Sequence, residues 1–406
     1  MIDEVVFDLI EKEKRRQQMT LCMIAAENTA PKPILEALGS YFNNKTAEGY
    51  PAHRYHTGCQ VADELEQLAI NRCKSIFGAG HANVQPHSGV NANLAVYSAV
   101  LQPGDTVISM KLSHGGHLSH GDPASITSRI YRFDHYGVNP NTELLDYDEI
   151  RKLALKRRPR MIVAGASSYP RLIDYVSLRT IAEEISAYLL VDMAHIAGLV
   201  AAQVIPSPVP HADFVTFTTY KTMMGPHGGV ILSKKIFSRD IDHAVFPGTQ
   251  GTPTLSLVAG KAVCFKLATT PEFIQIQKAT LKNAQILADE LRTRGYRLVT
   301  GGTDNHLVLI DLRSKALKGD VAERALEEVG ILANRNAIPY DSESTQTTSG
   351  LRMGTQAISA RGLREEEMRE ICKLIDQTLS AVGDESIKAK VRERVYGVCF
   401  RFPIDG

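Results

Sequence analysis

A lysine at position 221 stands where its amine could form a Schiff base with an aldehyde cofactor. Lys221 follows the apolar run 214–217 and a short stretch of hydroxyl residues, and a loop rich in glycine and proline comes after it. This order places the amine at the carboxyl end of an expected strand, where α/β sheets bind their ligands. Most lysines in such loops are simply solvated, so the interpretation depends on the other residues of the chain.

An aspartate at position 192 is the second candidate. It ends a strongly apolar run, residues 189–191, where a carboxylate is costly unless it has a partner. A protonated pyridine nitrogen would be such a partner, and the pair would keep the ring an electron sink. A cap on the following helix explains this residue equally well when it is taken alone. Because Asp192 precedes Lys221 by 29 residues, with one expected helix and one expected strand between them, the cofactor interpretation is favoured.

A turn at Ser88 and Gly89 could bind a phosphate. An expected strand ends before this pair, and a helix with apolar periodicity runs from it to Leu101. The free backbone amides at a helix start, together with the helix dipole, favour an anion there. Many helices begin with Ser-Gly, so this motif is weak by itself and counts only together with the lysine and the aspartate.

Three histidines, His114, His117 and His120, recur at a spacing of three residues. Such a set could bind a metal ion, but the Gly-Gly between the first two breaks the helix that would align them. No cluster of carboxylates or thiols lies nearby in the sequence. We therefore expect no metal site, and we assign one ring, that of His117, to stacking on a flat cofactor.

The elements that must position these residues alternate between short apolar runs and helical patterns. Five runs are typical of buried strands: 106–110, 161–164, 188–191, 214–217 and 230–232. Residues 150–156 and 178–186 have helical patterns between them. This alternation predicts an α/β fold with a mostly parallel sheet covered by helices on both faces.

The pattern changes after about residue 270, and the length of 406 residues already favours two domains. A long amphipathic helix, 273–295, is followed by segments of a smaller α+β unit at 306–312, 321–329 and 363–380. We expect an N-terminal helical arm at 1–45, opening with a charged helix over 1–18. A large cofactor-binding domain at 46–275 and a small C-terminal domain at 276–406 complete the prediction.

Composition excludes some classes of partner. The formal net charge is +1, from 46 basic and 45 acidic residues, which gives no reason to expect nucleic acid or an anionic membrane. No apolar run has the length of a membrane span, and the charged start is unlike a secretory signal. Six scattered cysteines without a CxxC pair are typical of reduced thiols. We therefore expect a cytoplasmic enzyme.

Together, and in this order, the four chemical elements resemble serine hydroxymethyltransferase, a pyridoxal-phosphate enzyme of fold type I. The resemblance covers nearly the whole chain and includes AEGYP at 47–51, NVQPHSG at 83–89, HGGHLSH at 114–120, VDMAHIAGLVAA at 191–202, AVFPG at 244–248, GGTDNHLVL at 301–309 and TSGLR at 348–352. It implies a seven-stranded sheet, pyridoxal phosphate as cofactor and tetrahydrofolate as co-substrate. It also implies a homodimer, or a tetramer, whose active sites are shared between subunits.

The family's pattern implies a role for each matching position. Lys221 is the Schiff-base lysine, Asp192 binds the pyridine nitrogen and His117 stacks on the ring as a catalytic residue. Arg352 clamps the substrate carboxylate with its bidentate fork, and Glu48 is the acid–base group near the substrate hydroxyl. Further cofactor positions are matched by Ser88 and Gly89 at the phosphate, His195 and Ser167 near the phenolic oxygen, Thr218, and Gly251 from the partner subunit. The substrate pocket is matched by Ala26, Thr46, Tyr55 and His56, and the folate pocket by Tyr55, Leu112, Gly116, Leu118 and Asn336.

The chain departs from the family's usual residues mainly at the active site. The family usually has Ser at Ala26, Tyr at Thr46, Tyr-Gly at His56-Thr57, Ser at Val90, His at Tyr220, Arg at His227 and Gly at Thr252. An enzyme that has diverged without a change of substrate should vary at its surface and keep its active-site residues. The pattern therefore predicts a changed substrate on the same chemistry, with a divergent but ordinary serine enzyme as the alternative.

Thr46 is the most informative departure. It replaces an aromatic ring beside the substrate with a smaller side chain, and Ala26 removes a polar contact. An added methyl would gain about 1–3 kcal/mol in an apolar pocket, which fits 2-methylserine and its product D-alanine. Because the folate positions are largely retained, we predict tetrahydrofolate as the one-carbon acceptor. The alternatives are ordinary serine/glycine transfer, a folate-independent aldolase or transaldolase acting on threonine-like amino acids, and a non-catalytic binding protein. The retained active-site residues argue against the last.

Overall fold

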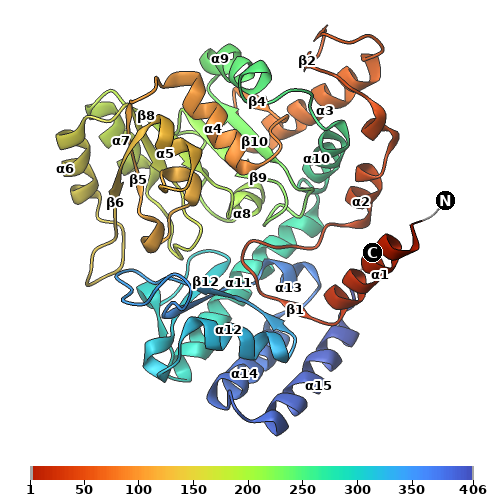
Figure 1. Cartoon of the computed structure of the whole chain (residues 1–406), viewed down its shortest axis with the longest axis vertical. Coiled ribbons are helices and arrows are strands. Elements are labelled where there is room, and N and C mark those ends of the chain that lie inside the picture. The colour runs from red at the N-terminus through yellow and green to blue at the C-terminus, as the bar shows by residue number, and fades with distance from the viewer. Residues whose placement is uncertain (1–2, 405–406) are drawn as a thin grey trace. The chain divides into compact units, whose positions relative to one another are not determined.

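The computed structural model describes residues 3–404, which gather into two compact units (Figure 1). The large unit runs from Ala30 to Gln277, and the small unit combines the chain before Ala30 with the chain after Gln277. The first 45 residues, expected as one helical arm, are thus divided between the two units. Residues 1–2 and 405–406, which fall in the expected arm and the expected C-terminal domain, lie outside the described residues.

The large unit is built on a seven-stranded sheet with the strand order β4-β10-β9-β8-β7-β5-β6. The strands are β4 (His81–Asn83), β5 (Thr106–Met110), β6 (Arg132–Tyr136), β7 (Met161–Ala164), β8 (Tyr188–Asp192), β9 (Phe214–Thr218) and β10 (Gly229–Ser233). The strands from β9 to β6 in this order pair in parallel, and β10 runs antiparallel to both β9 and β4. The predicted mostly parallel sheet is confirmed.

Helices cover both faces of this sheet. Phe214 and Phe217 of β9 point to opposite faces because side chains alternate along a strand. Phe214 belongs to a buried cluster with Ala95 and Val96 of α4 (Gly89–Val100). On the other face, the ring centroid of Phe217 lies 5.0 Å from that of Phe77, the last residue of α3 (Gln60–Phe77). The sheet therefore has a buried layer on each side, as α/β folds of this kind require.

The other helices of the large unit lie before, between and after the strands along the chain. They include α2 (Lys32–Leu38), α5 (Ile126–Ile130), α6 (Tyr147–Arg157), α7 (Tyr175–Glu184), α8 (Ala197–Ala201), α9 (Ser238–His243) and α10 (Leu255–Leu267). Asp146 and Asp174 fix the starts of α6 and α7, since their carboxylates accept from backbone amides of the first turn. The long helix α11 (Pro271–Thr293) contains the residue at which the large unit ends.

The small unit is an α+β structure around a four-stranded antiparallel sheet in the order β11-β12-β15-β14. Its strands are β11 (Arg297–Leu298), β12 (Leu307–Asp311), β14 (Asn334–Asn336) and β15 (Gly350–Gly354). Its helices include α12 (Gly319–Glu328), α13 (Gln356–Ala360), α14 (Glu365–Ser380) and α15 (Glu385–Arg401). The N-terminal helix α1 (Glu4–Gln18) leads into β1 (Leu21–Cys22), which pairs in parallel with β13 (Ile331–Leu332).

This pairing explains why the beginning of the chain belongs to the small unit. Leu21 and Met23 are fully buried in the same apolar cluster as Ile331 and Leu351. The segment therefore completes the core of a unit whose other residues lie more than 250 positions further along the chain. Within residues 3–404, no helix combines the length and apolar character needed to cross a membrane.

Candidate active site

The two residues on which the sequence argument rests leave neighbouring strands at the same edge of the large sheet. Asp192 ends β8, and Lys221 follows β9 after two further residues. These strands are parallel, with Asp192 opposite Thr216 in the register. Lys221 is only 6% exposed, so its amine lies inside the protein and not in a solvated loop. The carboxyl ends of the strands therefore bring an amine and a carboxylate to one region.

The Asp192 carboxylate is surrounded by hydrogen-bond donors. Its Oδ2 accepts from the Asn93 side-chain amide at 2.8 Å and lies 3.1 Å from Nε2 of His120, while Oδ1 accepts from the Ala194 amide at 2.9 Å. Burial opposes ionisation, but the hydrogen bond and charge of His120, with contributions from His117 and Asn93, hold the pKa of Asp192 well below its usual range. The carboxylate is ionised at neutral pH, as a partner of a protonated ring nitrogen must be.

The His117 ring lies close to the Asp192 carboxylate. Its Nδ1 is 2.8 Å from the Ser119 hydroxyl and accepts from the Ser119 amide at 3.2 Å. Burial lowers the pKa of His117 to about 4; the charge of Asp192 acts against this, while those of His120 and Lys221 add to it. The ring is thus neutral at physiological pH, which suits stacking on another aromatic ring. The ring centroid of His117 lies 5.5 Å from that of His120, whose Nε2 contacts Asp192, so His117 stands close to the carboxylate.

The start of helix α4 forms a close-fitting turn. Ser88 caps the helix, since its hydroxyl accepts from the Asn91 amide at 3.2 Å. A Cβ on Gly89 would stand 2.8 Å from Cγ2 of Thr218, and one on Gly229 would stand 2.2 Å from the Ser88 carbonyl oxygen. Glycines are therefore needed for β9 and β10 to approach this helix start, whose free amides are suited to an anion.

Two further cofactor candidates lie on loops tied to the same region. The Ser167 amide donates to the Gly115 carbonyl at 2.7 Å, which joins the loop after β7 to the loop that carries His117. The His195 carbonyl accepts from the Thr222 hydroxyl at 3.0 Å, one residue after Lys221. These bonds fix the loops to one another, whereas the direction of the His195 and Ser167 side chains toward a ligand stays a prediction.

The folate candidates of the large unit share the loop of His117. Leu112 and Leu118 begin two short 3-10 helices, η2 (Leu112–His114) and η3 (Leu118–His120), and both side chains are exposed. A Cβ on Gly116 would stand 2.3 Å from the Met110 carbonyl oxygen, so the loop needs glycine to turn back on the end of β5. An exposed apolar pair beside the histidine is suited to a flat aromatic ligand, and its use for folate stays a prediction.

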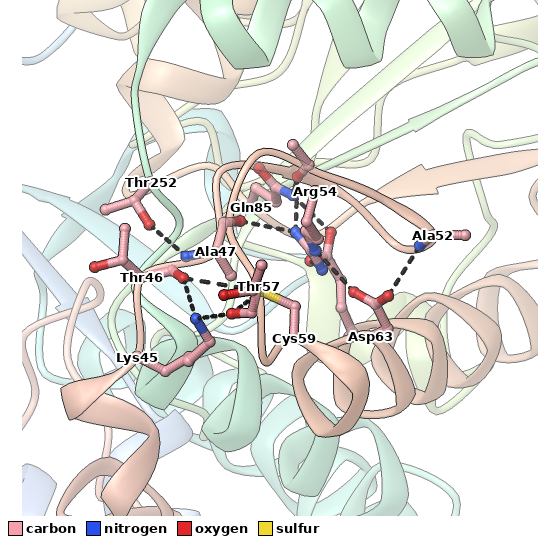
Figure 2. Close-up of polar contacts among 12 residues, drawn as sticks. Lys45, Thr46, Ala47, Ala52, Arg54, Thr57, Cys59, Asp63, Gln85 and Thr252 are labelled. Carbon is pink, nitrogen blue, oxygen red and sulfur yellow. Dashed lines mark hydrogen bonds and ion pairs between the residues drawn. The ribbon is translucent and has the colours of Figure 1, made fainter.

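A second group of candidates lies on residues 45–59 and on the loop before α10, and Figure 2 shows polar contacts of these two segments, including those of Thr46 and Thr252. Glu48 follows the buried Ala47, and its Oε1 is 3.5 Å from where a Cβ on Gly251 would stand. The Tyr55 amide donates to the Glu48 carbonyl at 3.0 Å across the hairpin of β2 (Gly49–Tyr50) and β3 (His53–Arg54). Thr46, Tyr55 and His56 are exposed. The structure therefore places Glu48 beside Gly251.

The remaining candidates belong to the small unit. Arg352 lies on β15 opposite Asn334 of β14, and its guanidinium donates to the Asn334 side-chain oxygen at 3.4 Å. Burial lowers the pKa of Arg352 to about 10, still well above neutral, so the group remains a cation. Asn336 is two residues further along β14. Ala26 follows Ala25, whose Cα stands 2.6 Å from the position of a Cβ on Gly354 at the end of β15.

Asp192, Lys221 and the turn at Ser88 and Gly89 fit pyridoxal phosphate. The cofactor needs an amine for its aldehyde, an anion for its ring nitrogen and donors for its phosphate. Lys221 supplies a buried amine, Asp192 an ionised carboxylate, and the start of α4 the backbone amides. The close contact between Gly89 and Thr218 packs the start of α4 against the end of β9, which places the backbone amides of this helix start at the carboxyl ends of the strands.

A comparison with protein families supports this fit. The family model described as serine hydroxymethyltransferase matches residues 1–375. The chain belongs to the serine hydroxymethyltransferase family. It is therefore a hydroxymethyltransferase that depends on pyridoxal phosphate and uses tetrahydrofolate as its co-substrate. The family binds an amino acid and tetrahydrofolate and works as an oligomer.

Sequence reasoning missed the partners of Asp192. Asn93 also donates to the Ser119 hydroxyl at 3.0 Å and accepts from the Thr216 hydroxyl at 2.6 Å. It thus joins the aspartate, the loop of His117 and strand β9. Asn93 stands in the helix after the Ser-Gly turn, and its one visible signal was a polar residue at a position where the helix should be apolar.

The three spaced histidines have three different uses. His114 accepts from the Val138 amide at its Nδ1, at 3.1 Å, while His117 contacts Ser119 and His120 contacts Asp192. Nowhere in residues 3–404 do three or more His, Cys, Asp or Glu side chains stand close enough together to hold a metal ion. The capping interpretation of Asp192 also differs from the structure, because helix α8 begins at Ala197 with Ile196 at its N-cap.

Proposed function

We propose that this hydroxymethyltransferase favours 2-methylserine, whose hydroxymethyl group it transfers to tetrahydrofolate with release of D-alanine. The observation that carries the proposal is Thr46, which stands where the family usually has tyrosine, two residues before Glu48. The smaller side chain leaves space beside the position of the substrate. Filling that space with a methyl group would gain about 1–3 kcal/mol, or roughly 10- to 200-fold in kcat/KM.

The chain's own groups divide the work of the reaction. Lys221 holds the cofactor through its amine, and the ionised Asp192 keeps a ring nitrogen protonated. When bound, pyridoxal phosphate supplies the electron sink for the pair released as the Cα–Cβ bond breaks. Arg352 binds the substrate carboxylate and so sets which bond at Cα is presented for cleavage. Glu48 assists proton movement at the substrate hydroxyl.

The chemistry of 2-methylserine restricts which bond at Cα can break first. Its Cα is quaternary and has no proton to lose, so cleavage of Cα–Cβ or decarboxylation is the only productive first step. Cleavage releases the hydroxymethyl carbon at the oxidation level of formaldehyde, and tetrahydrofolate accepts it. The carbon left behind takes up a proton and becomes Cα of alanine. Leu112, Leu118 and Asn336, at the family's folate positions, support a folate acceptor.

Steady-state kinetics test the proposal. The purified holoenzyme is assayed with 2-methylserine, serine and threonine, each with and without tetrahydrofolate. We expect kcat/KM for 2-methylserine with folate to exceed that for serine at least about tenfold. Preference for serine with folate would identify an ordinary serine/glycine enzyme. Rapid threonine cleavage that is indifferent to folate would identify an aldolase instead, and either result would overturn the proposal.

A reverse substitution ties the substrate preference to one residue. Thr46→Tyr restores the family's usual side chain and should lower kcat/KM for 2-methylserine by about tenfold or more, with a much smaller effect on serine. Thr46→Ser is the matched control, because it keeps a small hydroxyl side chain and should keep the preference. An equal loss for both substrates in Thr46→Tyr would indicate a general disturbance and not a filled cavity.

We also propose that the family's oligomeric assembly is here a homodimer with shared active sites, located in the cytoplasm. The exposed apolar side chains of α1, which include Val5, Phe7 and Ile10, support a partner subunit. Size-exclusion chromatography with light scattering should give twice the mass of one 44.6 kDa chain. A mass of one chain would contradict a dimer, and four chains would indicate a tetramer.

A further inference from the structure

Three of the departures from the family lie together around the segment that carries Glu48. Figure 2 shows Thr46 and Thr57 beside Lys45, and Thr252 beside Ala47. Thr252 is about 200 residues from the other two in the sequence, yet the hydrogen bonds around all three involve the backbone of the segment 46–57. Departures that share contacts can act as one unit.

Lys45 closes the loop that runs from residue 46 to residue 57. Its ammonium donates to the carbonyl of Thr46 at 2.8 Å and to the carbonyl of Thr57 at 3.0 Å. The Cys59 thiol lies 3.9 Å and 3.7 Å from the same two oxygens. The two ends of the segment that contains Glu48 and Tyr55 are thereby tied to each other.

Thr252, which lies outside the segment 46–57 in the sequence, also binds the backbone of that segment. Its hydroxyl accepts from the Ala47 amide at 3.1 Å, and Ala47 stands between Thr46 and Glu48. The family's usual glycine at this position has no side chain and would leave the amide without this bond. The contact is therefore a property of this chain and not of the family's pattern.

Arg54 holds the opposite side of this backbone. Its Nη1 donates to the carbonyls of Ala47 at 2.9 Å and Gly49 at 2.7 Å, while Nε and Nη2 bind Asp63 and Glu66. Ala47 is thus held through its carbonyl by an arginine anchored on α3 and through its amide by Thr252. Only the second of these two contacts is made by a residue at which the chain departs from the family.

We propose that Thr252 is a positioning residue for substrate selection, which acts by fixing Ala47 and, with Lys45, the placement of Thr46 and Glu48. The proposal deepens the function proposed above and rests on it. Where the family usually has a tyrosine, a small threonine can favour one substrate only if its backbone stays in place. A hydroxyl at residue 252 supplies that constraint.

Three substitutions of Thr252 separate the effect of its hydroxyl from the effect of its side-chain shape. Thr252→Gly gives the family's usual residue, Thr252→Val keeps the shape without the hydroxyl, and Thr252→Ser keeps the hydroxyl. Thr254→Val is the matched control, because Thr254 is also exposed and makes no side-chain capping bond at the start of α10. Both positions are exposed, so each of the four variant holoenzymes should remain folded.

The first readout is hydrogen–deuterium exchange at the Ala47 amide, followed by mass spectrometry with fragmentation. Loss of one hydrogen bond should speed exchange by about fivefold in Thr252→Gly and Thr252→Val. Thr252→Ser and Thr254→Val should exchange like the wild type. This readout is independent of any substrate, so unchanged exchange in Thr252→Val would overturn the positioning role whichever amino acid the enzyme prefers.

The second readout is the ratio of kcat/KM for 2-methylserine to that for serine. We expect it to fall about fivefold in Thr252→Gly and Thr252→Val, with lower kcat and higher KM for 2-methylserine, and to recover in Thr252→Ser. Faster exchange with an unchanged ratio would overturn the role in selection. If the wild type prefers serine, the proposed function fails, but the change of ratio still decides whether Thr252 contributes to selection.

Discussion

At the scale of single residues, the site depends on how a buried carboxylate is kept charged. Asp192 sits in a region where burial alone would raise its pKa, and the donors around it reverse the effect. Asn93 is the most connected of them, since it contacts Asp192, Ser119 and Thr216 at once. A neutral amide is well suited to this position because it can donate to the carboxylate and accept from the threonine hydroxyl.

Replacement of Asn93 should therefore weaken cofactor binding. Asn93→Ala removes a hydrogen bond to a charged group and leaves the Thr216 hydroxyl without its acceptor, so we expect pyridoxal phosphate to bind about 10- to 100-fold more weakly. Asn93→Asp should be worse, because it places a second carboxylate next to Asp192. The dissociation constant is measured by absorbance titration of the apoenzyme.

Ser98→Ala provides the control for this prediction. Ser98 lies on the same helix, and its hydroxyl donates to the carbonyl of Ala95, three residues earlier, at 3.1 Å. Its cofactor affinity should match that of the wild type. Affinity in Asn93→Ala equal to that of Ser98→Ala would mean that the amide contributes nothing to the aspartate.

The residues that could be predicted are marked by the residues next to them in the sequence. Those that were missed make contacts that no local sequence pattern indicates. Lys221 and Asp192 could be found because each follows a strongly apolar strand, and a charged group in such a place is unusual. Asn93 and Asp192 are 99 residues apart in the sequence, and no sequence pattern indicates that their side chains are in contact. The stacking of Tyr220 on His227, with ring centroids 4.0 Å apart, was equally invisible, although both residues were noted separately as departures.

At the scale of elements, the start of α4 is held in place by a buried lysine. Lys261 of α10 is 1% exposed, and its ammonium donates to the carbonyls of Val84 at 2.6 Å, Pro86 at 3.0 Å and Gly229 at 2.9 Å. These three bonds use all three hydrogens of the group. They connect α10 with the segment that leads from β4 into α4 and with the first residue of β10.

Removal of this ammonium should loosen the phosphate site and the fold together. Lys261→Met keeps much of the side-chain volume but leaves three carbonyls without their donor, so we expect the free energy of unfolding to fall by about 3 kcal/mol. Urea denaturation measures the loss, and pyridoxal phosphate titration should show weaker binding. Lys266→Met, at an exposed position of the same helix, should stay within about 0.5 kcal/mol of the wild type, and an equal effect of the two changes would contradict this account.

The strands and helices were predicted to different extents. The runs 106–110 and 161–164 coincide with β5 and β7, because fully buried parallel strands are continuous apolar stretches. Strand β6 was not predicted, since Arg132–Tyr136 forms one edge of the sheet and is mostly polar. The division at Thr29 also escaped prediction, because β1 contains two residues and its partner β13 lies about 310 positions away in the chain.

At the scale of the whole molecule, the candidate residues for one active site fall into separate groups, which different parts of the chain hold in place. Asp192 ends β8, and Lys221 and His117 lie in the loops that follow β9 and β5. Glu48 lies instead beside Gly251, a position that the family's pattern assigns to the partner subunit's site. If Gly251 serves the neighbouring subunit, then Glu48 must serve it too, because the two are in contact range within one chain.

This arrangement predicts that two inactive chains can restore one active site. Lys221→Ala and Glu48→Ala should each lose nearly all activity as homodimers, since every site lacks one essential group. Co-expressed with different tags and purified on both, they form hybrid dimers in which one site has both defects and the other has none. Such hybrids should regain about half of the wild-type activity, because one of two equivalent sites is intact. The control pairs Lys221→Ala with Asp192→Asn. Both residues belong to the site of their own chain, so each of the two sites in this hybrid lacks one essential group. If the first pair stays as inactive as the control, Glu48 acts in its own subunit and the shared site is wrong.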